Sequence, residues 1–211
     1  MTTLIVIAKE PLPGKAKTRL HPPFTLEQAA ELAAAAIDDT LAAVADLPAS
    51  RRILLFDGVK PPIGSADFDL IPQVEGDLDE RLAAIFDEVT GPTVLIGMDT
   101  PQLALHDLAE AFPWPDDVDA FFGPASDGGF WALGLAEPRG DLIRGVPMSR
   151  DDTGRVQLQR LFDADLSVKL LPTLTDVDTI DDAHVAAALA PNSLFASMLA
   201  NFTSLSSVSA E

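Results

Sequence analysis

The chain has 211 residues, 47% of them hydrophobic, and its 14 basic and 33 acidic residues give a formal net charge of −19. A chain of this length is expected to form one domain, because a single core of that size buries enough apolar surface. A surface this acidic repels phosphate backbones and anionic lipid headgroups. We therefore expect no nucleic-acid partner and no membrane partner. The chain contains no cysteine, which excludes disulfides, thiolate nucleophiles and cysteine metal sites.

Targeting signals are not evident in the sequence. The apolar run from Met1 to Ala8 is too short for a signal peptide, and the acidic Glu10 follows it at once. No stretch approaches the about 20 consecutive apolar residues that a membrane-spanning helix needs. We therefore expect a cytoplasmic protein.

Strands and helices are predicted to alternate along most of the chain. The first half predicts a strand at Leu4–Ala8, a helix at Leu26–Ala45 capped by Thr25, strands at Arg52–Phe56 and Phe68–Pro72, a helix at Asp77–Val89 and a strand at Thr93–Gly97. The second half predicts a helix at Leu103–Phe112, strands at Val118–Phe122 and Phe130–Leu135, a helix at Asp151–Asp163, a strand at Val168–Leu171 and a helix at Ile180–Leu189.

This alternation predicts a three-layer α/β/α, Rossmann-like fold with a mainly parallel mixed sheet and helices on both faces. Ligands of such sheets bind beyond the carboxyl ends of the strands, which selects the loops after Ala8, Gly97 and Leu171 as candidate site loops. Residues 1–190 are expected to form the single domain. Residues 191–211 are Ser-rich with weak periodicity and are interpreted as a C-terminal tail, either docked on the body, mobile, or contributing to a homodimer contact.

The loop after the first strand concentrates positive charge in an acidic protein. It holds four of the 14 basic residues, Lys9, Lys15, Lys17 and Arg19, together with Gly14, which permits close backbone approach. This combination favours a polyphosphate-binding loop. The alternative is a solvated loop that pairs with neighbouring carboxylates. Neither the Walker A spacing nor a dinucleotide-binding GxGxxG pattern is present.

Two sets of carboxylates follow predicted strands and are candidate metal ligands. Asp99 comes just after the clearest buried strand, where its oxygens would face the ligand crevice and could hold a divalent cation. Asp176 and Asp178 form a DxD pair after the last strand that could complete the site. The alternatives are local: Asp99 could form an Asx turn, and Asp178 could cap the last helix. The same spacing recurs at Asp67/Asp69, Asp77/Asp79, Asp117/Asp119 and Asp163/Asp165.

The segment Asp127-Gly128-Gly129 lies between two predicted strands. It is either a hairpin turn alone or a turn that brings backbone N–H groups and a carboxylate up to a substrate. No GxSxG elbow accompanies it, so a serine hydrolase lacks its parts.

Taken in order, the motifs resemble a bacterial family of poorly characterised transferases described as CofC-like, with the GT-A (nucleotide-diphospho-sugar transferase) fold. They are Lys-x-Pro-x-Pro-Gly-x-x-Lys-Thr-Arg-Leu from Lys9, Gly-Asp-Leu at residue 76, Gly-x-Asp-x-Pro at residue 97, Gly-Pro-Ala-x-Asp-Gly-Gly at residue 123 and Asp-Val-Asp-Thr at residue 176. The resemblance spans residues 4 to about 189. The basic loop is also similar to that of 2-phospho-lactate guanylyltransferases and, more distantly, of molybdenum-cofactor guanylyltransferases.

The resemblance implies roles for individual residues. The residues that would bind the nucleotide are Lys9, Pro13, Gly14, Lys15, Lys17, Thr18, Arg19, Gly76 and Asp77. The stretch from Gln73 to Arg81 would lie near the base or ribose. Asp99 and Asp178 would hold Mg²⁺, with Mn²⁺ as the alternative, and Lys17, Arg19 and Asp99 would be catalytic. Asp127, Gly128 and Gly129 would line the acceptor side.

Two positions depart from the family pattern. Asp79 stands where relatives commonly have glycine after Gly-Asp-Leu, and it adds negative charge near the expected nucleotide. The segment Gly145 to Arg150 does not match the Gly/Ser-rich acceptor motif of the 2-phospho-lactate enzymes. The acceptor of those enzymes therefore does not carry over to this chain.

Three functions fit these observations. The leading hypothesis is a Mg²⁺-dependent nucleotidyltransferase that moves an NMP from an NTP, with GTP a candidate donor, to a small phosphorylated acceptor. The first alternative is a GT-A glycosyltransferase that uses a nucleotide sugar, to which the DxD pair is equally suited. The second is a non-catalytic nucleotide-binding protein of the same fold. The dense basic loop favours a triphosphate over a diphospho-sugar.

Overall fold

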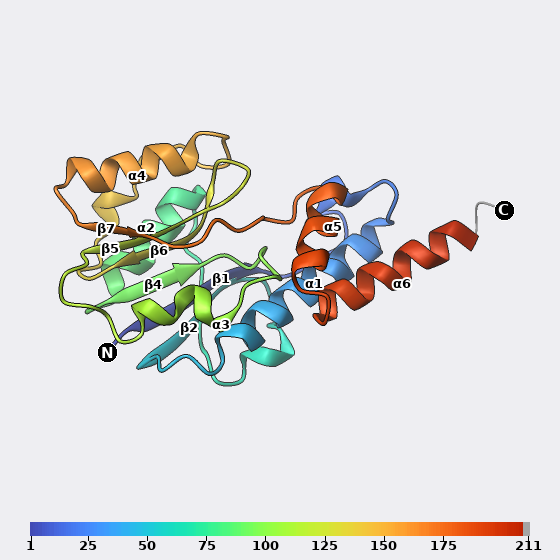
Figure 1. Cartoon of the computed structure of the whole chain (residues 1–211), viewed down its shortest axis with the longest axis horizontal. Coiled ribbons are helices and arrows are strands. Elements are labelled where there is room, and N and C mark those ends of the chain that lie inside the picture. Colours follow the sequence, from blue (N-terminus) through green and yellow to red (C-terminus); the bar gives the residue numbers. More distant parts are fainter. Residues whose placement is uncertain (209–211) are drawn as a thin grey trace.

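The computed structural model describes residues 1–208, with side chains through residue 204 (Figure 1). Its centre is a seven-stranded sheet in the order β3-β2-β1-β4-β6-β5-β7, in which only β6 runs antiparallel to its neighbours. The strands are β1 (Thr3–Lys9), β2 (Arg51–Asp57), β3 (Asp69–Pro72), β4 (Thr93–Ile96), β5 (Ala120–Pro124), β6 (Phe130–Leu135) and β7 (Val168–Leu170). This mainly parallel mixed sheet confirms the predicted fold class.

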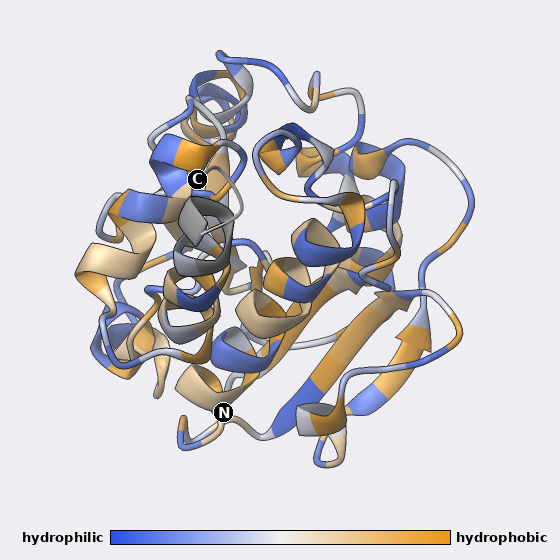
Figure 2. Cartoon of the chain, turned by 90° about the vertical axis from the view of Figure 1, so that its right-hand side faces the viewer, coloured by the Kyte–Doolittle hydropathy of each residue, from blue (hydrophilic) through white to orange (hydrophobic). Residues whose placement is uncertain are grey.

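Helices cover both faces of the sheet. They are α1 (Leu26–Val44), α2 (Leu78–Glu88), α3 (Leu105–Leu108), α4 (Thr153–Asp163), α5 (Ile180–Leu189) and α6 (Leu194–Val208), with short 3-10 turns at Thr18–Leu20, Ile63–Ser65, Ala109–Ala111 and Gly140–Leu142. Alternate residues of β1 point to opposite faces, as a strand requires. Leu4 and Val6 pack with α1 and α3, whereas Ile5 packs with α2 and α4. Figure 2 shows the hydrophobic strands running between these helices.

A third core lies beside the sheet and joins α1, α5 and α6. Phe195 and Leu199, four residues apart on one face of α6, are buried against the α1 residues of this core. Asp39 of α1 accepts hydrogen bonds from the first two backbone N–H groups of α6, those of Leu194 (2.9 Å) and Phe195 (2.8 Å). In Figure 1 α6 lies along α1 and continues past it.

The sequence predicts no helix within residues 191–211. Residues 194–208 are helical, and the cap and the apolar partners of this helix come from α1. The last three residues of the predicted tail, 209–211, lie outside the described part of the chain. The division of the chain into a domain of residues 1–190 and a tail of residues 191–211 stays an interpretation.

Most remaining elements lie close to their predicted positions. The predicted helix at Leu103–Phe112 is instead the single turn α3 followed by a 3-10 turn, and it stops before Pro113, which has no N–H to donate. Asp77 is the N-cap residue of α2 and not its first helical residue. No helix within residues 1–208 is long and apolar enough to cross a membrane.

Candidate functional site

A cleft of about 660 Å³ opens at the carboxyl ends of β1 and β4. That is the edge at which ligands bind in open parallel sheets, and the volume is within the range for small-molecule sites. Arg19 and residues from six separate stretches line it: Ile7–Lys9, Gln73–Leu82, Leu95–Asp99, Asp127–Trp131, Met148–Thr153 and Asp176–Asp182. The cleft therefore collects the loops that the sequence singles out.

Lys17 lies at the centre of a charged cluster on this edge. Its Nζ is 2.8 Å from Oδ1 of Asp99 and 3.1 Å from Oδ1 of Asp178, and its side chain is only 7% exposed. Arg19 Nη1 is 3.2 Å from the other carboxylate oxygen of Asp178. Burial by itself lowers the pKa of Lys17, but the charges of Asp99 and Asp178 outweigh it, so that the pKa is raised. Lys17 is an ammonium in this arrangement.

Two hydrogen bonds to backbone carbonyls bring Asp99 and Asp178 together, although 79 positions separate them in the sequence. The Val177 N–H donates to the carbonyl of Asp99 (2.9 Å), and Gln102 Nε2 donates to the carbonyl of Thr175 (2.8 Å). Val177 is 1% exposed and packs into the core shared by α1 and α5. Because side chains alternate in extended chain, its burial turns both flanking aspartates toward the cleft.

Asp176, which the sequence offered only as part of the DxD pair, is the most perturbed carboxyl of the cleft. Its pKa is raised to about 7, first by burial and then by the negative charges of Asp99 and Asp127, with a smaller contribution from Asp178 and an opposing one from Lys17. The spacing alone could not single it out, because the same DxD pattern recurs along the chain. Its burial comes from tertiary structure.

The carboxylates fit a divalent cation. Hard divalent cations such as Mg²⁺ and Mn²⁺ take oxygen ligands, and here Asp99, Asp176 and Asp178 lie together, with the pKa of Asp176 raised first by burial and then by its acidic neighbours. Oδ1 of Asp99 is buried, and the Lys17 ammonium, 2.8 Å away, is its one partner among the described residues. Within the described part of the chain no three carboxylates or imidazoles already stand close enough to form a metal cage. Lys17 occupies the space between two of them.

The basic loop borders a smaller adjoining cleft of about 180 Å³. Five predicted nucleotide-binding residues line it together with the two aspartates: Lys9, Lys15, Lys17, Thr18 and Arg19. Lys17 itself has a left-handed backbone (φ 48°), as does Gly14 (φ 74°). The buried Ala16 anchors the loop between them. Pro13 and Gly14 shape the turn, but neither is among the residues lining either cleft.

The Gly76 loop is held by a polar chain that begins at the sheet. Gln73 Nε2 donates to the carbonyls of Ala8 (2.9 Å) and Leu55 (3.2 Å), and Gln73 Oε1 accepts from Arg81 Nη1 (3.2 Å). Arg81 Nε in turn donates to the Gly76 carbonyl (2.8 Å). Gln73 and Arg81 line the larger cleft, whereas Gly76 and Asp77 are not among its lining residues.

The Asp-Gly-Gly segment is both a hairpin turn and a wall of the cleft. It connects the antiparallel strands β5 and β6, and Asp127 Oδ1 accepts from the Gly129 N–H (2.8 Å). A Cβ on Gly128 would lie 1.9 Å from the carbonyl oxygen of Asp151, so the start of α4 packs directly on the turn. Asp127 and Gly129 line the larger cleft, but Gly128 is not among its lining residues. That Asp127, Gly128 and Gly129 line the acceptor side stays a prediction.

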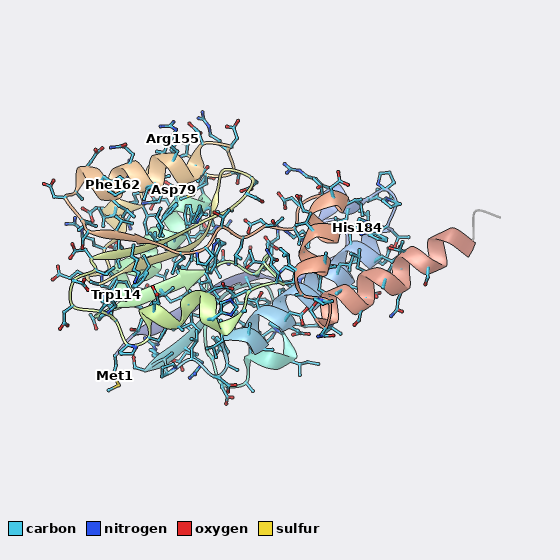
Figure 3. All side chains as sticks on the ribbon, in the orientation of Figure 1. Met1, Asp79, Trp114, Arg155, Phe162 and His184 are labelled. Atoms are coloured by element: carbon cyan, nitrogen blue, oxygen red, sulfur yellow. The ribbon has the colours of Figure 1, made fainter. Side chains whose placement is uncertain are left out.

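A wall that the sequence did not reveal faces this turn. Met148, Ser149 and Arg150 line the cleft, and the segment before them is tied to α2. Asp79 Oδ2 accepts from the Gly145 N–H (2.8 Å), so the residue that departs from the family pattern fixes this segment in place. Figure 3 labels Asp79 beneath α4, and it labels His184 on α5, on the opposite side of the molecule. In the sequence, the one sign of this wall was that the segment from Gly145 to Arg150 does not match the acceptor motif of the 2-phospho-lactate enzymes.

The fold and the cleft define a protein with a nucleotidyltransferase-like or nucleotide-diphospho-sugar-transferase-like architecture. A structure from Desulfovibrio desulfuricans G20, provisionally described as a nucleotide-diphospho-sugar transferase, is 26% identical, with 97% of this chain and 96% of that one covered and a TM-score of 0.84. This chain belongs to the family described as uncharacterized proteins conserved in bacteria (DUF2064), which matches residues 27–150. No curated protein matches the sequence.

Two more distant structures share the fold. A nucleotidyl transferase from Methanothermobacter is 14% identical, with 90% of this chain and 98% of that chain covered and a TM-score of 0.61. A Mycobacterium tuberculosis H37Rv protein in complex with manganese is 20% identical, with 88% and 96% covered and a TM-score of 0.51. The predicted resemblance to CofC-like and GT-A-fold transferases is confirmed, and the chain has the architecture of a transferase.

Proposed function

We propose that this protein is a divalent-metal-dependent nucleotidyltransferase, which joins an NMP from an NTP to a small phosphorylated acceptor. The observation that carries the proposal is the meeting of two opposite charge clusters at one sheet edge. Lys17 and Arg19 of the basic loop contact Asp178, and Lys17 contacts Asp99, in a protein that is otherwise strongly acidic. In the reaction an acceptor oxygen attacks the α-phosphorus, a P–O bond forms, and pyrophosphate leaves with the electrons of the broken bond.

The basic loop supplies the charge that a triphosphate needs. Lys9, Lys15, Lys17 and Arg19 border the smaller cleft, next to the aspartates. Ammonium and guanidinium groups at this position neutralise the β- and γ-phosphates and the charge that builds on the departing pyrophosphate. The base and ribose would extend along the larger cleft toward Gln73 and Arg81. GTP is the candidate donor.

Asp99 and Asp178, together with Asp176, are the residues that would hold Mg²⁺ or Mn²⁺. When bound, the ion supplies charge neutralisation between the α-phosphate and the acceptor oxygen. Two features support this assignment: the buried Oδ1 of Asp99 has a cation, the Lys17 ammonium, as its partner, and burial together with the neighbouring carboxylates raises the pKa of Asp176. The manganese complex of the distant Mycobacterium tuberculosis relative is consistent with it.

The acceptor is proposed to lie against the Asp127 turn and the wall of residues 148–150. Arg150 supplies a guanidinium there for an acidic group. A phosphate oxygen of the acceptor is already ionised near neutral pH, so positioning and charge neutralisation suffice and no side-chain base is required. That accounts for a cleft lined with aspartates, with neither cysteine nor histidine among its lining residues.

The test is ligand-dependent thermal stability, measured with GTP, ATP, CTP, UTP, UDP-glucose and GDP-mannose, each with and without Mg²⁺. A ligand that binds the native state raises the unfolding midpoint. A Mg²⁺-dependent rise with a triphosphate is the expected result and names the donor. No rise with any triphosphate would overturn the proposal, and no rise with any compound at all would favour the non-catalytic alternative.

Glycosyl transfer is the second candidate, favoured by one comparison. The 26%-identical relative from Desulfovibrio desulfuricans G20 carries the description of a nucleotide-diphospho-sugar transferase. In that reaction the same aspartates and basic residues would stabilise a departing nucleoside diphosphate. A rise in the midpoint with a nucleotide sugar alone would select this function.

A further inference from the structure

Lys17 stands where a metal ion would be expected. Its ammonium contacts Oδ1 of Asp99 at 2.8 Å and Oδ1 of Asp178 at 3.1 Å, and these carboxylates are the two that the metal assignment requires. The lysine side chain is 7% exposed, while those of Asp99 and Asp178 are 34% and 42% exposed. The ammonium is therefore buried, as is the Asp99 oxygen that it contacts, while both aspartate side chains as a whole remain partly exposed.

A divalent ion and this ammonium compete for the same two oxygens. An ammonium at hydrogen-bonding distance from each carboxylate fills the space that an oxygen-ligated ion would need, and two cations held there would repel each other strongly. The remaining cationic neighbour, Arg19, contacts only the outer oxygen Oδ2 of Asp178 and leaves Oδ1 to Lys17. Metal entry at Asp99 and Asp178 thus requires that Lys17 withdraw.

The structure also offers a place to which Lys17 could withdraw. Lys17 lines the smaller cleft together with Lys9, Lys15 and Thr18, the residues proposed to surround the triphosphate. A lysine carries its charge on a flexible four-carbon chain, so its ammonium can be reoriented with little backbone movement. Phosphate oxygens in that cleft would replace the carboxylates as its partners.

We propose that Lys17 is an internal counter-ion of the metal site, exchanged between the aspartates and the triphosphate, so that metal and triphosphate bind cooperatively. This inference rests on the proposed function. Without nucleotide, the ammonium holds Asp99 and Asp178 together and weakens the binding of free metal. With nucleotide, the phosphates take the ammonium and the carboxylates become available. By linkage, metal and triphosphate then raise each other's affinity by the same factor.

The experiment measures Mn²⁺ binding to the full chain by electron paramagnetic resonance, in wild type, Lys17→Met and Lys15→Met. Methionine keeps an unbranched side chain and removes the charge. Lys15 lines the same small cleft, but no ion pair among the described residues joins it to Asp99 or Asp178, so Lys15→Met controls for the loss of one positive charge. Lys17→Gln, checked by circular dichroism, serves if Lys17→Met does not fold.

Lys17→Met is expected to bind free Mn²⁺ about tenfold more tightly than wild type, and clearly more tightly than Lys15→Met. The opposite order is expected for the preformed complex of Mn²⁺ with tripolyphosphate, followed by calorimetry: wild type binds it more tightly than Lys17→Met. The wild-type protein also shows cooperativity between Mn²⁺ and tripolyphosphate that Lys17→Met lacks.

The outcomes separate this inference from the proposed function. Equal affinity of wild type and Lys17→Met for free Mn²⁺, with tight binding by both, would leave the metal site standing and overturn the counter-ion role. An equal gain in Lys15→Met and Lys17→Met would also overturn it, because net charge alone would then explain the change. If none of the three proteins binds Mn²⁺ with or without tripolyphosphate, the metal site itself is wrong and both proposals fail.

Discussion

Two clusters of charged side chains, one at the clefts and one between α2 and residues 140–145, differ in how completely their charges are paired. The metal-site cluster consists of Lys17, Asp99, Asp176 and Asp178. The clamp network consists of Asp79, Glu80, Asp87 and Arg144, and it ties α2 to the segment that precedes the proposed acceptor wall. Both mix aspartates with basic residues, and both join stretches far apart in the sequence.

In the clamp network every acidic side chain has partners. Arg144 donates to Glu80 (3.0 Å) and to Asp87 (2.7 Å), and Asp87 also accepts from the Gly140 N–H. The hydrogen bond from Gly140, followed by that from Arg144, lowers the pKa of Asp87. The Asp87 carboxylate is thus stabilised as an anion, and the network holds α2 against residues 140–145.

In the metal-site cluster the balance is reversed. The pKa of Asp176 is raised to about 7, and a single ammonium, that of Lys17, is shared between Asp99 and Asp178. A buried carboxyl with a raised pKa, such as that of Asp176, gains from a nearby cation, because the cation stabilises its charged form. The difference between the clusters therefore lies in how fully the charges are satisfied and not in which residue types are present.

The largest expected effect comes from Asp99→Asn, which tests the metal-site cluster. The amide keeps the shape but removes the charge, so we expect at least about a hundredfold loss of turnover in the presence of the donor that the thermal assay identifies. The Mg²⁺-dependent rise in the unfolding midpoint with triphosphate should vanish as well. The midpoint without ligand should change little, because Lys17 keeps its contact with Asp178. Full activity in this variant would contradict the metal assignment.

Arg144→Met provides the contrasting result. Its removal leaves Glu80 without its arginine partner and Asp87 with only the Gly140 N–H, so the unfolding midpoint should fall. Free Mn²⁺ binding should stay at the wild-type level, because Arg144 does not touch the metal-site cluster. A parallel loss of Mn²⁺ binding would show that the two clusters are not independent, and thermal unfolding with paramagnetic resonance on the same sample distinguishes these results.

The sequence predicted these two clusters to very different degrees. The basic loop and Asp99 each directly follow a buried apolar strand, and the parallel sheet brings the ends of those strands to one edge. The burial of Asp176 could not be predicted, because it depends on Val177 packing into a core with α1. The clamp network could not be predicted either, since Asp87 and Arg144 lie 57 positions apart with no local pattern joining them.

The helix α6, which lies away from the cleft, was also not predictable from its own segment. Its own sequence has weak periodicity, and its first N–H groups are capped by Asp39, a residue of α1. The periodicity and the capping residues of a segment predict a helix only where the segment supplies its own cap and its own apolar face. Elements whose caps or apolar contacts come from elsewhere in the chain become visible only when the fold is known.

Asp79→Ala is expected to have a smaller effect than Arg144→Met and to sharpen the interpretation of the acceptor wall. It removes the hydrogen bond from Asp79 to the Gly145 N–H, at a cost of about 1 kcal/mol in the free energy of unfolding. Urea unfolding measures this loss. Asp79→Asn is the matched control, because its amide oxygen can still accept the bond. If both variants lose the same stability, the charge near the start of α2 and not the bond to Gly145 is responsible.

The smallest expected effect is a pH dependence of stability that belongs to the clamp network alone. The ordinary pKa of an aspartate is 3.8 here, and in the folded protein the pKa of Asp87 is lower. Above the unfolded value the bonds to Gly140 and Arg144 contribute in full, and their contribution is lost as the pH falls through the lower, folded value. Asp87→Asn should therefore flatten the acid side of the stability curve relative to wild type. Because the side chain is half exposed, solvent screening keeps the change small, and an acid limb of unchanged slope in Asp87→Asn would show that other carboxylates set it.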